Sequence, residues 1–185
     1  MLAFMNKIRL LFILLLPLSL LAQDSKIPWT QSVKLTWSDF EAPVDASSEF
    51  YAWTQYYFNY NYKWDGEGKV TVNVKTSFVK NQSWRNTSKS LSPVLLKHEQ
   101  GHFDLAEVYG RKMRKAYTAY CFSHKHTANT KTEIDDIFNK LLDETHVSQA
   151  QYDQQTGHSR AIGQQEEWNT KIAAMLAGLS EYAER

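Results

Sequence analysis

The sequence predicts an α+β fold in which a small antiparallel sheet with a hairpin packs on a long helix and two further helices. The first half of the chain alternates apolar and polar residues as strands do, whereas the second half repeats its apolar residues every three or four positions. The chain has 185 residues, of which 43% are hydrophobic and 22% are charged. This balance suits one soluble globular domain.

The first 22 residues have the layout of a secretory signal peptide. Lys7 and Arg9 precede an uncharged, mostly apolar run over residues 10–21, and Ala22 offers a small residue for cleavage. The run is shorter than the roughly 20 residues that span a bilayer, so we expect no stable membrane span after cleavage. An uncleaved N-terminal anchor is the alternative. The sequence thus predicts a signal peptide over residues 1–22, a single domain over residues 23–185 and a secreted or periplasmic location.

Charge and cysteine content exclude several classes of protein and site. The net charge is only +1, from 21 basic and 20 acidic side chains, so we expect no nucleic-acid partner. Cys121 is the single cysteine, which excludes an intrachain disulfide and a zinc site built from thiolates. Any metal site here therefore takes histidine and carboxylate ligands. The oligomeric state is not indicated by the sequence.

The predicted hairpin lies in the first half of the chain. Aromatic residues crowd positions 50–62, and those at 56, 58, 60 and 62 share one parity, as one face of a strand requires. A turn follows at residues 65–68, and valines at 70, 72 and 74 alternate with polar residues in a second strand. An earlier short strand is expected around residues 33–37. We interpret the aromatic stripe as the core side of the sheet rather than as a platform for a ligand.

Three helices are predicted in the second half. Ser92 and Pro93 mark the start of the first, with a hydroxyl at the cap and proline at the first helical position, and its periodicity runs to about residue 120. The second opens near Thr130, which has capping-box spacing to Glu133. A break at residues 156–159 precedes the third, which carries Trp168.

The first helix contains the motif His98-Glu99-Gln100-Gly101-His102. Its two histidines lie about 40° apart around the helix axis and one turn apart along it, so both can bind one zinc ion. Glu99 is then placed to act as the general base toward water on the metal. The alternative is a pair of hydrogen-bonded core histidines. The predicted cofactor is Zn²⁺.

The two faces of this helix are predicted to differ. Both histidines fall on its apolar stripe and should point into the protein. We expect Gly101 to allow a close approach by substrate or by another backbone segment. Asp104 and Glu107 are not expected to be ligands, and Glu107 should pair with Arg111 across one turn. A polar stripe, predicted to face solvent, contains Lys97, Gln100, Asp104, Glu107, Arg111 and Arg114.

A catalytic zinc ion has three protein ligands and an open fourth position. His158, in the break before the third helix, is the favoured third ligand because adjacent Gly157 permits a tight approach. Tyr152, six residues earlier, is a candidate to donate its hydroxyl to a developing oxyanion, with a buried structural tyrosine as the alternative. The other candidate ligands are Glu144, His146, Glu166 and Glu167, while His124 and His126 are interpreted as part of a solvated turn.

Several segments together carry a resemblance to known proteins. They are Leu35-Thr36-Trp37-Ser38-Asp39-Phe40, Ser83-Trp84, Leu96-Lys97-His98-Glu99-Gln100-Gly101-His102-Phe103-Asp104, Tyr152-Asp153, Thr156-Gly157-His158 and the helix with Trp168. With these segments the chain resembles the zincin metallopeptidases, and it is similar to a family of small secreted bacterial proteins of unknown function that is grouped with them. Asp104, where many zincins have an apolar residue, and Ser159, where glycine is expected, depart from the pattern.

The resemblance implies a zincin-like fold and a set of roles. His98 and His102 would be metal ligands, Glu99 the catalytic base and His158 the third ligand. A small sheet would pack on the motif helix, and its edge strand could pair with an extended peptide or protein substrate.

The leading hypothesis is a secreted or periplasmic zinc-dependent metallopeptidase that hydrolyses peptide bonds by zinc-bound water activated by Glu99. The first alternative is a non-catalytic, metal-binding protein of the cell envelope that interacts with a partner. The second is a metal-dependent hydrolase acting on a non-peptide substrate of the envelope.

Overall fold

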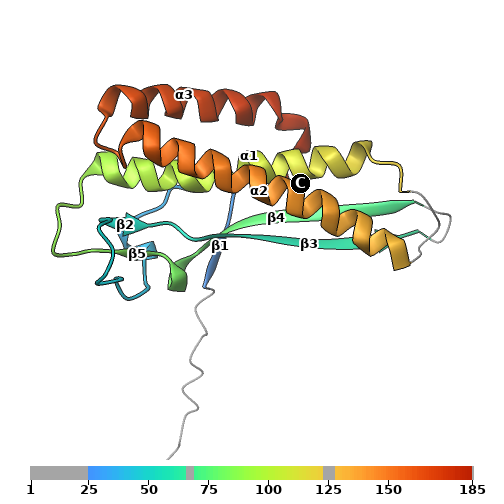
Figure 1. Cartoon of the computed structure of the whole chain (residues 1–185), viewed down its shortest axis with the longest axis horizontal. Coiled ribbons are helices and arrows are strands. Elements are labelled where there is room, and N and C mark those ends of the chain that lie inside the picture. The colour runs from blue at the N-terminus through green and yellow to red at the C-terminus, as the bar shows by residue number, and fades with distance from the viewer. Residues whose placement is uncertain (1–24, 66–68, 123–127, 185) are drawn as a thin grey trace, which may run out of the picture.

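The computed structural model describes residues 25–65, 69–122 and 128–184. Helices cover one face of an antiparallel sheet, which confirms the predicted α+β class (Figure 1). The predicted signal peptide lies outside the described residues. Within them, no helix is both long and apolar enough to cross a membrane.

The sheet has three strands in the order β1-β4-β3. Strand β4 (Val70–Val79) pairs antiparallel with β1 (Lys26–Pro28) on one side and with β3 (Tyr56–Trp64) on the other. A separate antiparallel pair joins β2 (Ala52–Trp53) to β5 (Trp84–Arg85). Strand β3 is therefore an outer strand of the main sheet.

The predicted hairpin of β3 and β4 is confirmed, and so is its register of faces. Tyr60 lies opposite Val74, and Phe58 lies opposite Thr76. Phe58 is buried in the main core together with valines 70, 72 and 74, while tyrosines 56, 60 and 62 are partly buried against it. Their common parity places the aromatic residues on the side of the sheet that packs on the helices.

The expected strand around residues 33–37 is wrong. The first strand lies earlier, at Lys26–Pro28, and Leu35 instead sits in irregular backbone before a short 3₁₀ helix. The backbone N–H of Leu35 donates to the side-chain oxygen of Gln100 at 2.8 Å, so it is satisfied without a strand partner. The apolar side chain is buried against Phe103 and its neighbours, which explains its strand-like pattern in the sequence.

Within the described ranges, three α-helices and three 3₁₀ helices complete the fold. Ser92 caps the first α-helix as predicted, since its hydroxyl oxygen accepts from the N–H of Leu95 at 3.1 Å. The second begins before Thr130, so Thr130 lies inside the helix and is not its N-cap. The bounds are α1 (Pro93–Ala119), α2 (Ala128–Thr156), α3 (Ile162–Gly178), η1 (Trp37–Asp39), η2 (Lys80–Gln82) and η3 (Ser180–Tyr182).

Helix α1 is the centre of the molecule, with β4 on one side and α2 and α3 on others (Figure 1). The prediction that its polar stripe faces solvent is therefore wrong for its middle part. Glu107 and Arg111 are 2% and 5% exposed: Arg111 donates to the carbonyl of Leu176 on α3, and Glu107 pairs with Arg111 and Arg114. The predicted pairing of Glu107 with Arg111 is confirmed, with Nε and Oε1 3.0 Å apart.

Candidate metal centre

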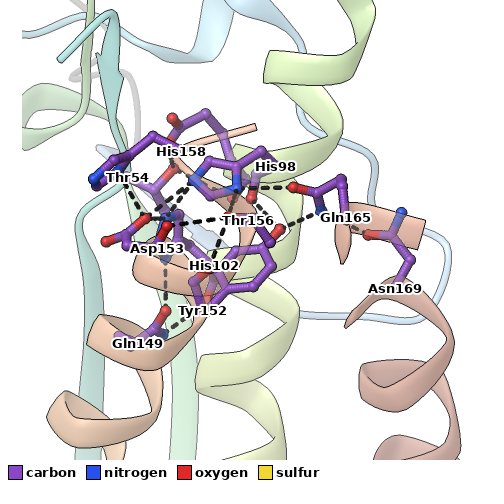
Figure 2. A network of polar contacts seen from close by, with 11 residues as sticks. Thr54, His98, His102, Gln149, Tyr152, Asp153, Thr156, His158, Gln165 and Asn169 are labelled. Atoms are coloured by element: carbon purple, nitrogen blue, oxygen red, sulfur yellow. Dashed lines mark hydrogen bonds and ion pairs between the residues drawn. The ribbon is translucent and has the colours of Figure 1, made fainter. Parts of the chain in front are cut away.

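The two motif histidines meet on α1 as their spacing predicts. Their rings are 4.6 Å apart and nearly perpendicular, and their Nε2 atoms are 3.1 Å apart. His98 is almost fully buried, and the side chain of His102 is 13% exposed. Both point into the protein, toward the last turns of α2 (Figure 2).

Asp153, near the end of α2, is the residue on which the histidines converge. Its Oδ1 atom lies 3.1 Å from Nε2 of His98, 3.0 Å from Nε2 of His102 and 3.1 Å from Nδ1 of His158. Potential ligand atoms of His98, Asp153 and His158 all lie within 4.8 Å of one another. Sequence reasoning did not select Asp153 as a ligand, and its signals there were its position five residues before His158 and its place in the Tyr152-Asp153 segment of the resemblance.

His158 reaches this cluster through an unusual turn. The backbone φ angles of Gly157, His158 and Ser159 are 55°, 51° and 72°, a left-handed run that reverses the chain after α2. Residues other than glycine adopt this left-handed backbone conformation only at a steric cost in free energy. The N–H of His158 donates to the carbonyl of Asp153 at 3.1 Å, and its ring packs 4.6 Å from that of Phe50. In this position of the ring, Nδ1 is the nitrogen that lies next to Asp153.

The cluster shifts the acidity of its members. Burial acts to raise the pKa of Asp153, but hydrogen bonds from His102 and His98 outweigh it and hold this pKa well below its usual range. For His102, burial acts to lower the pKa, yet the hydrogen bond and charge of Asp153 raise it above its ordinary value. The site therefore favours a negatively charged Asp153 beside a positively charged His102.

Glu99 lies beside the histidines at the wall of a cavity of about 750 Å³. It is 3% exposed, and its Oε2 atom accepts a hydrogen bond of 2.7 Å from the hydroxyl of Thr54. The histidines and Asp153 line the same cavity. Aromatic side chains supply much of its remaining wall: Phe50, Tyr51, Trp53, Tyr56, Tyr57, Phe58 and Phe138.

Tyr152 is a supporting residue of the site. It is fully buried, and its ring stacks on that of His98 at 4.6 Å with an angle of 18°. Its hydroxyl donates to the carbonyl oxygen of His98 at 3.1 Å, and burial raises its pKa. These contacts favour the structural alternative over an oxyanion donor. They also explain Gly101, whose Cβ would lie 2.2 Å from this hydroxyl, so the close neighbour is a side chain and not a backbone segment.

Two glutamines contact the outer nitrogens of the histidines. Oε1 of Gln149 lies 2.6 Å from Nδ1 of His102, and Oε1 of Gln165 lies 3.0 Å from Nδ1 of His98 (Figure 2). Both glutamines are buried, Gln149 on α2 and Gln165 on α3. Neither was selected from the sequence, where glutamine carries no motif signal.

The donor set has the ligand chemistry of a zinc site, and three of its atoms have the spacing of one. Donor atoms 2.0–2.1 Å from zinc at the corners of a tetrahedron are about 3.3 Å apart. Nε2 of His98, Nε2 of His102 and Oδ1 of Asp153 lie 3.0–3.1 Å from one another, and Nδ1 of His158 lies as near to Oδ1. Three imidazoles and a carboxylate are the ligand types that zinc takes when thiolates are missing.

The other histidines and carboxylates considered as metal ligands from the sequence lie away from this cluster or outside the described residues. Glu166 pairs with Lys97 at 2.9 Å, and Glu144 and Glu167 are exposed. His146 lines the cavity but is exposed. His124 and His126 lie outside the described residues.

A family model described as bacterial protein of unknown function (DUF922) matches residues 36–159. The chain belongs to this family. The match agrees with the predicted likeness to a bacterial domain of unknown function, and its span contains all four candidate ligands, whereas α3 with Gln165 lies beyond it. Searches of curated proteins and of solved structures found no match. Kinship with the zincins stays a prediction.

Proposed function

We propose that this protein is a zinc-dependent peptidase that acts outside the cytoplasm. The observation that carries the proposal is that ring nitrogens of His98, His102 and His158 all lie 3.0–3.1 Å from one oxygen of Asp153, at the wall of an open cavity that Glu99 also lines. In this proposal the three histidines hold the metal. Zinc supplies a Lewis acid that polarises a carbonyl group and lowers the pKa of water.

Glu99 acts as the general base that takes a proton from water and delivers it to the leaving amine. The hydroxyl of Thr54 holds Oε2 of Glu99 and so orients the carboxylate in the cavity wall. Burial of Glu99 beside the ligands strengthens this assignment, since a nearly buried carboxylate with a single threonine donor is costly unless a cation lies nearby.

The substrate in this proposal is an extended peptide or protein segment. Strand β3 is an outer strand, and its first residues line the cavity, so the substrate can add to this strand by backbone hydrogen bonds. The aromatic wall favours peptides with bulky apolar side chains near the cleaved bond.

The test compares Glu99→Gln with wild-type protein in cleavage of a peptide library read by mass spectrometry, with zinc content measured in parallel. We expect a loss of about 10²–10⁴ in the rate of cleavage, with zinc retained. Glu144→Gln, which changes an exposed acid on α2, is the matched control and should cleave normally. Equal turnover by Glu99→Gln would exclude Glu99 as the base, and zinc retention by His98→Ala and His102→Ala would exclude the metal site.

Asp153 supports one alternative, a non-catalytic metal-binding protein of the cell envelope. If its carboxylate binds the metal together with three histidines, the site is closed, as structural zinc sites are. Cobalt-substituted protein discriminates the two functions. An absorption change on adding acetohydroxamate indicates an open position and favours the peptidase, whereas an unchanged spectrum favours the closed site.

A further inference from the structure

The structure assigns a specific task to Gln149 and Gln165: we propose that they hold a hydrogen on Nδ1 of His102 and His98, which directs Nε2 of both rings toward the metal. Both are positioning residues, because each acts through a histidine. Zinc as the bound ion rests on the proposed function, but the position of the hydrogens does not.

The orientation of Gln149 follows from a group that can only accept. Its Nε2 atom donates to the backbone carbonyl of His102 at 3.0 Å, and a carbonyl oxygen has no hydrogen to give. This contact identifies which end of the amide is the NH₂ group, an assignment that side-chain shape alone leaves open. The other end, Oε1, therefore faces Nδ1 of His102 at 2.6 Å. An amide oxygen also has no hydrogen, so Nδ1 must carry one.

The orientation of Gln165 follows by one more step. The hydroxyl of Tyr152 uses its single hydrogen to donate to the backbone carbonyl of His98 at 3.1 Å. Gln165 must then donate through Nε2 to that hydroxyl, at 2.7 Å. Its Oε1 atom is thereby turned to Nδ1 of His98 at 3.0 Å.

Thr156 adds a second acceptor at the same nitrogen. Its hydroxyl donates to the carbonyl of Tyr152 at 2.7 Å, which leaves its oxygen to face Nδ1 of His98 at 3.4 Å. Nδ1 of His98 therefore meets two acceptors and must carry a hydrogen.

Hydrogens on both Nδ1 atoms leave the two Nε2 atoms available to bind a cation. With hydrogens held on Nδ1, the two Nε2 atoms, 3.1 Å apart and 3.0–3.1 Å from Oδ1 of Asp153, turn lone pairs toward one another and toward this oxygen whenever the rings are neutral. Such an arrangement requires a proton or a metal ion in its centre. In metal sites, the hydrogen bond at the outer nitrogen of a histidine sets which nitrogen binds. Because Gln165 lies on α3, this helix is part of the site.

The first experiment uses metal-free wild-type protein and needs no variant. Imidazole ¹⁵N chemical shifts, correlated with ring protons by NMR, report which nitrogens carry hydrogen. We expect protonated Nδ1 in both His98 and His102. A bare Nδ1 in either ring of the folded protein would overturn the proposal for that ring.

The second experiment measures affinity for zinc ion alone, by competition with a chromophoric chelator. Gln165→Met and Gln149→Met remove the acceptor at similar volume and should each weaken zinc binding about 10–100-fold. Gln165→Glu and Gln149→Glu keep an acceptor at Nδ1 and should restore the affinity, which a loss of packing would not allow. Gln164→Met, at the exposed neighbouring position, is the control and should bind as wild type. A folded Met variant with wild-type affinity would contradict the proposal.

The two experiments separate this proposal from the proposed function. Protonated Nδ1 atoms without any peptide cleavage would remove the peptidase and leave the glutamine task intact. Peptide cleavage by a protein in which Nδ1 of His98 and His102 carries no hydrogen would leave the peptidase intact and remove the task of the glutamines.

Discussion

Helix α1 carries two buried polar clusters, and they are built on the same four-residue spacing. One joins His98 and His102 to Asp153 and His158. The other, which we call the ion-pair cluster, joins Glu107 to Arg111 and Arg114, whose nitrogens lie 3.0 and 2.5 Å from Oε1.

The two clusters differ in how their polar atoms are satisfied. In the ion-pair cluster, carboxylate meets guanidinium, and further guanidinium N–H groups donate to the carbonyls of Leu176 and Val74. In the histidine cluster, ring nitrogens and a carboxylate oxygen face one another around a point that needs a proton or a metal ion, and a cavity opens beside them. Burial of polar residues alone therefore does not indicate function. Function is indicated instead by buried polar groups whose arrangement needs a cation to complete it.

The largest effect on stability is expected in the ion-pair cluster. Glu107→Ala leaves two buried guanidinium groups without their carboxylate, which should lower the free energy of unfolding by about 3–5 kcal/mol. Zinc content of the folded protein should not change. Urea unfolding with zinc in excess measures the effect, with exposed Glu167→Ala as control. A loss below about 1 kcal/mol would mean that the cluster is solvated in solution.

The glycines of α1 offer a matched pair of variants. A Cβ at Gly101 would lie 2.2 Å from the hydroxyl of Tyr152, and one at Gly110 would lie 2.3 Å from that of Thr76. Both alanine variants should lose about 1–3 kcal/mol of stability through crowding. Only Gly101→Ala should also weaken zinc binding, because Tyr152 and the ring of His98 must move. Chelator competition checks this, and equal zinc affinities of the two variants would contradict it.

The smallest effect concerns the turn that carries His158. Ser159 has a φ of 72°, which glycine adopts without a steric penalty. Ser159→Gly should therefore raise the free energy of unfolding by about 0.5 kcal/mol, since relief of strain is partly offset by a more flexible unfolded chain. Thermal unfolding of metal-free protein measures the change. A lower melting temperature would show that the serine side chain stabilises the turn.

Much of the fold could be predicted because its signals are local. The capped start of α1, the hairpin and the break after α2 each depend on residues close together in the sequence. The prediction of a strand at residues 33–37 is wrong for a tertiary reason. Leu35 is apolar because it is buried in the cluster with Phe103, and its backbone N–H donates to the side chain of Gln100 on α1 and not to a strand.

The sequence by itself determined the paired histidines and Glu99 of the candidate site, because helical spacing places such residues on neighbouring positions whatever surrounds them. Only the tertiary structure decided their partners. Thr54 is 45 residues from Glu99, Asp153 is 55 residues from His98, and Gln165 is 67 residues from it. It likewise decided that the middle of the polar stripe of α1 is buried, since a helix face meets solvent or protein according to what packs on it. Spacing along one helix is fixed by its hydrogen bonds, whereas contacts between distant segments depend on how the whole chain buries its apolar surface.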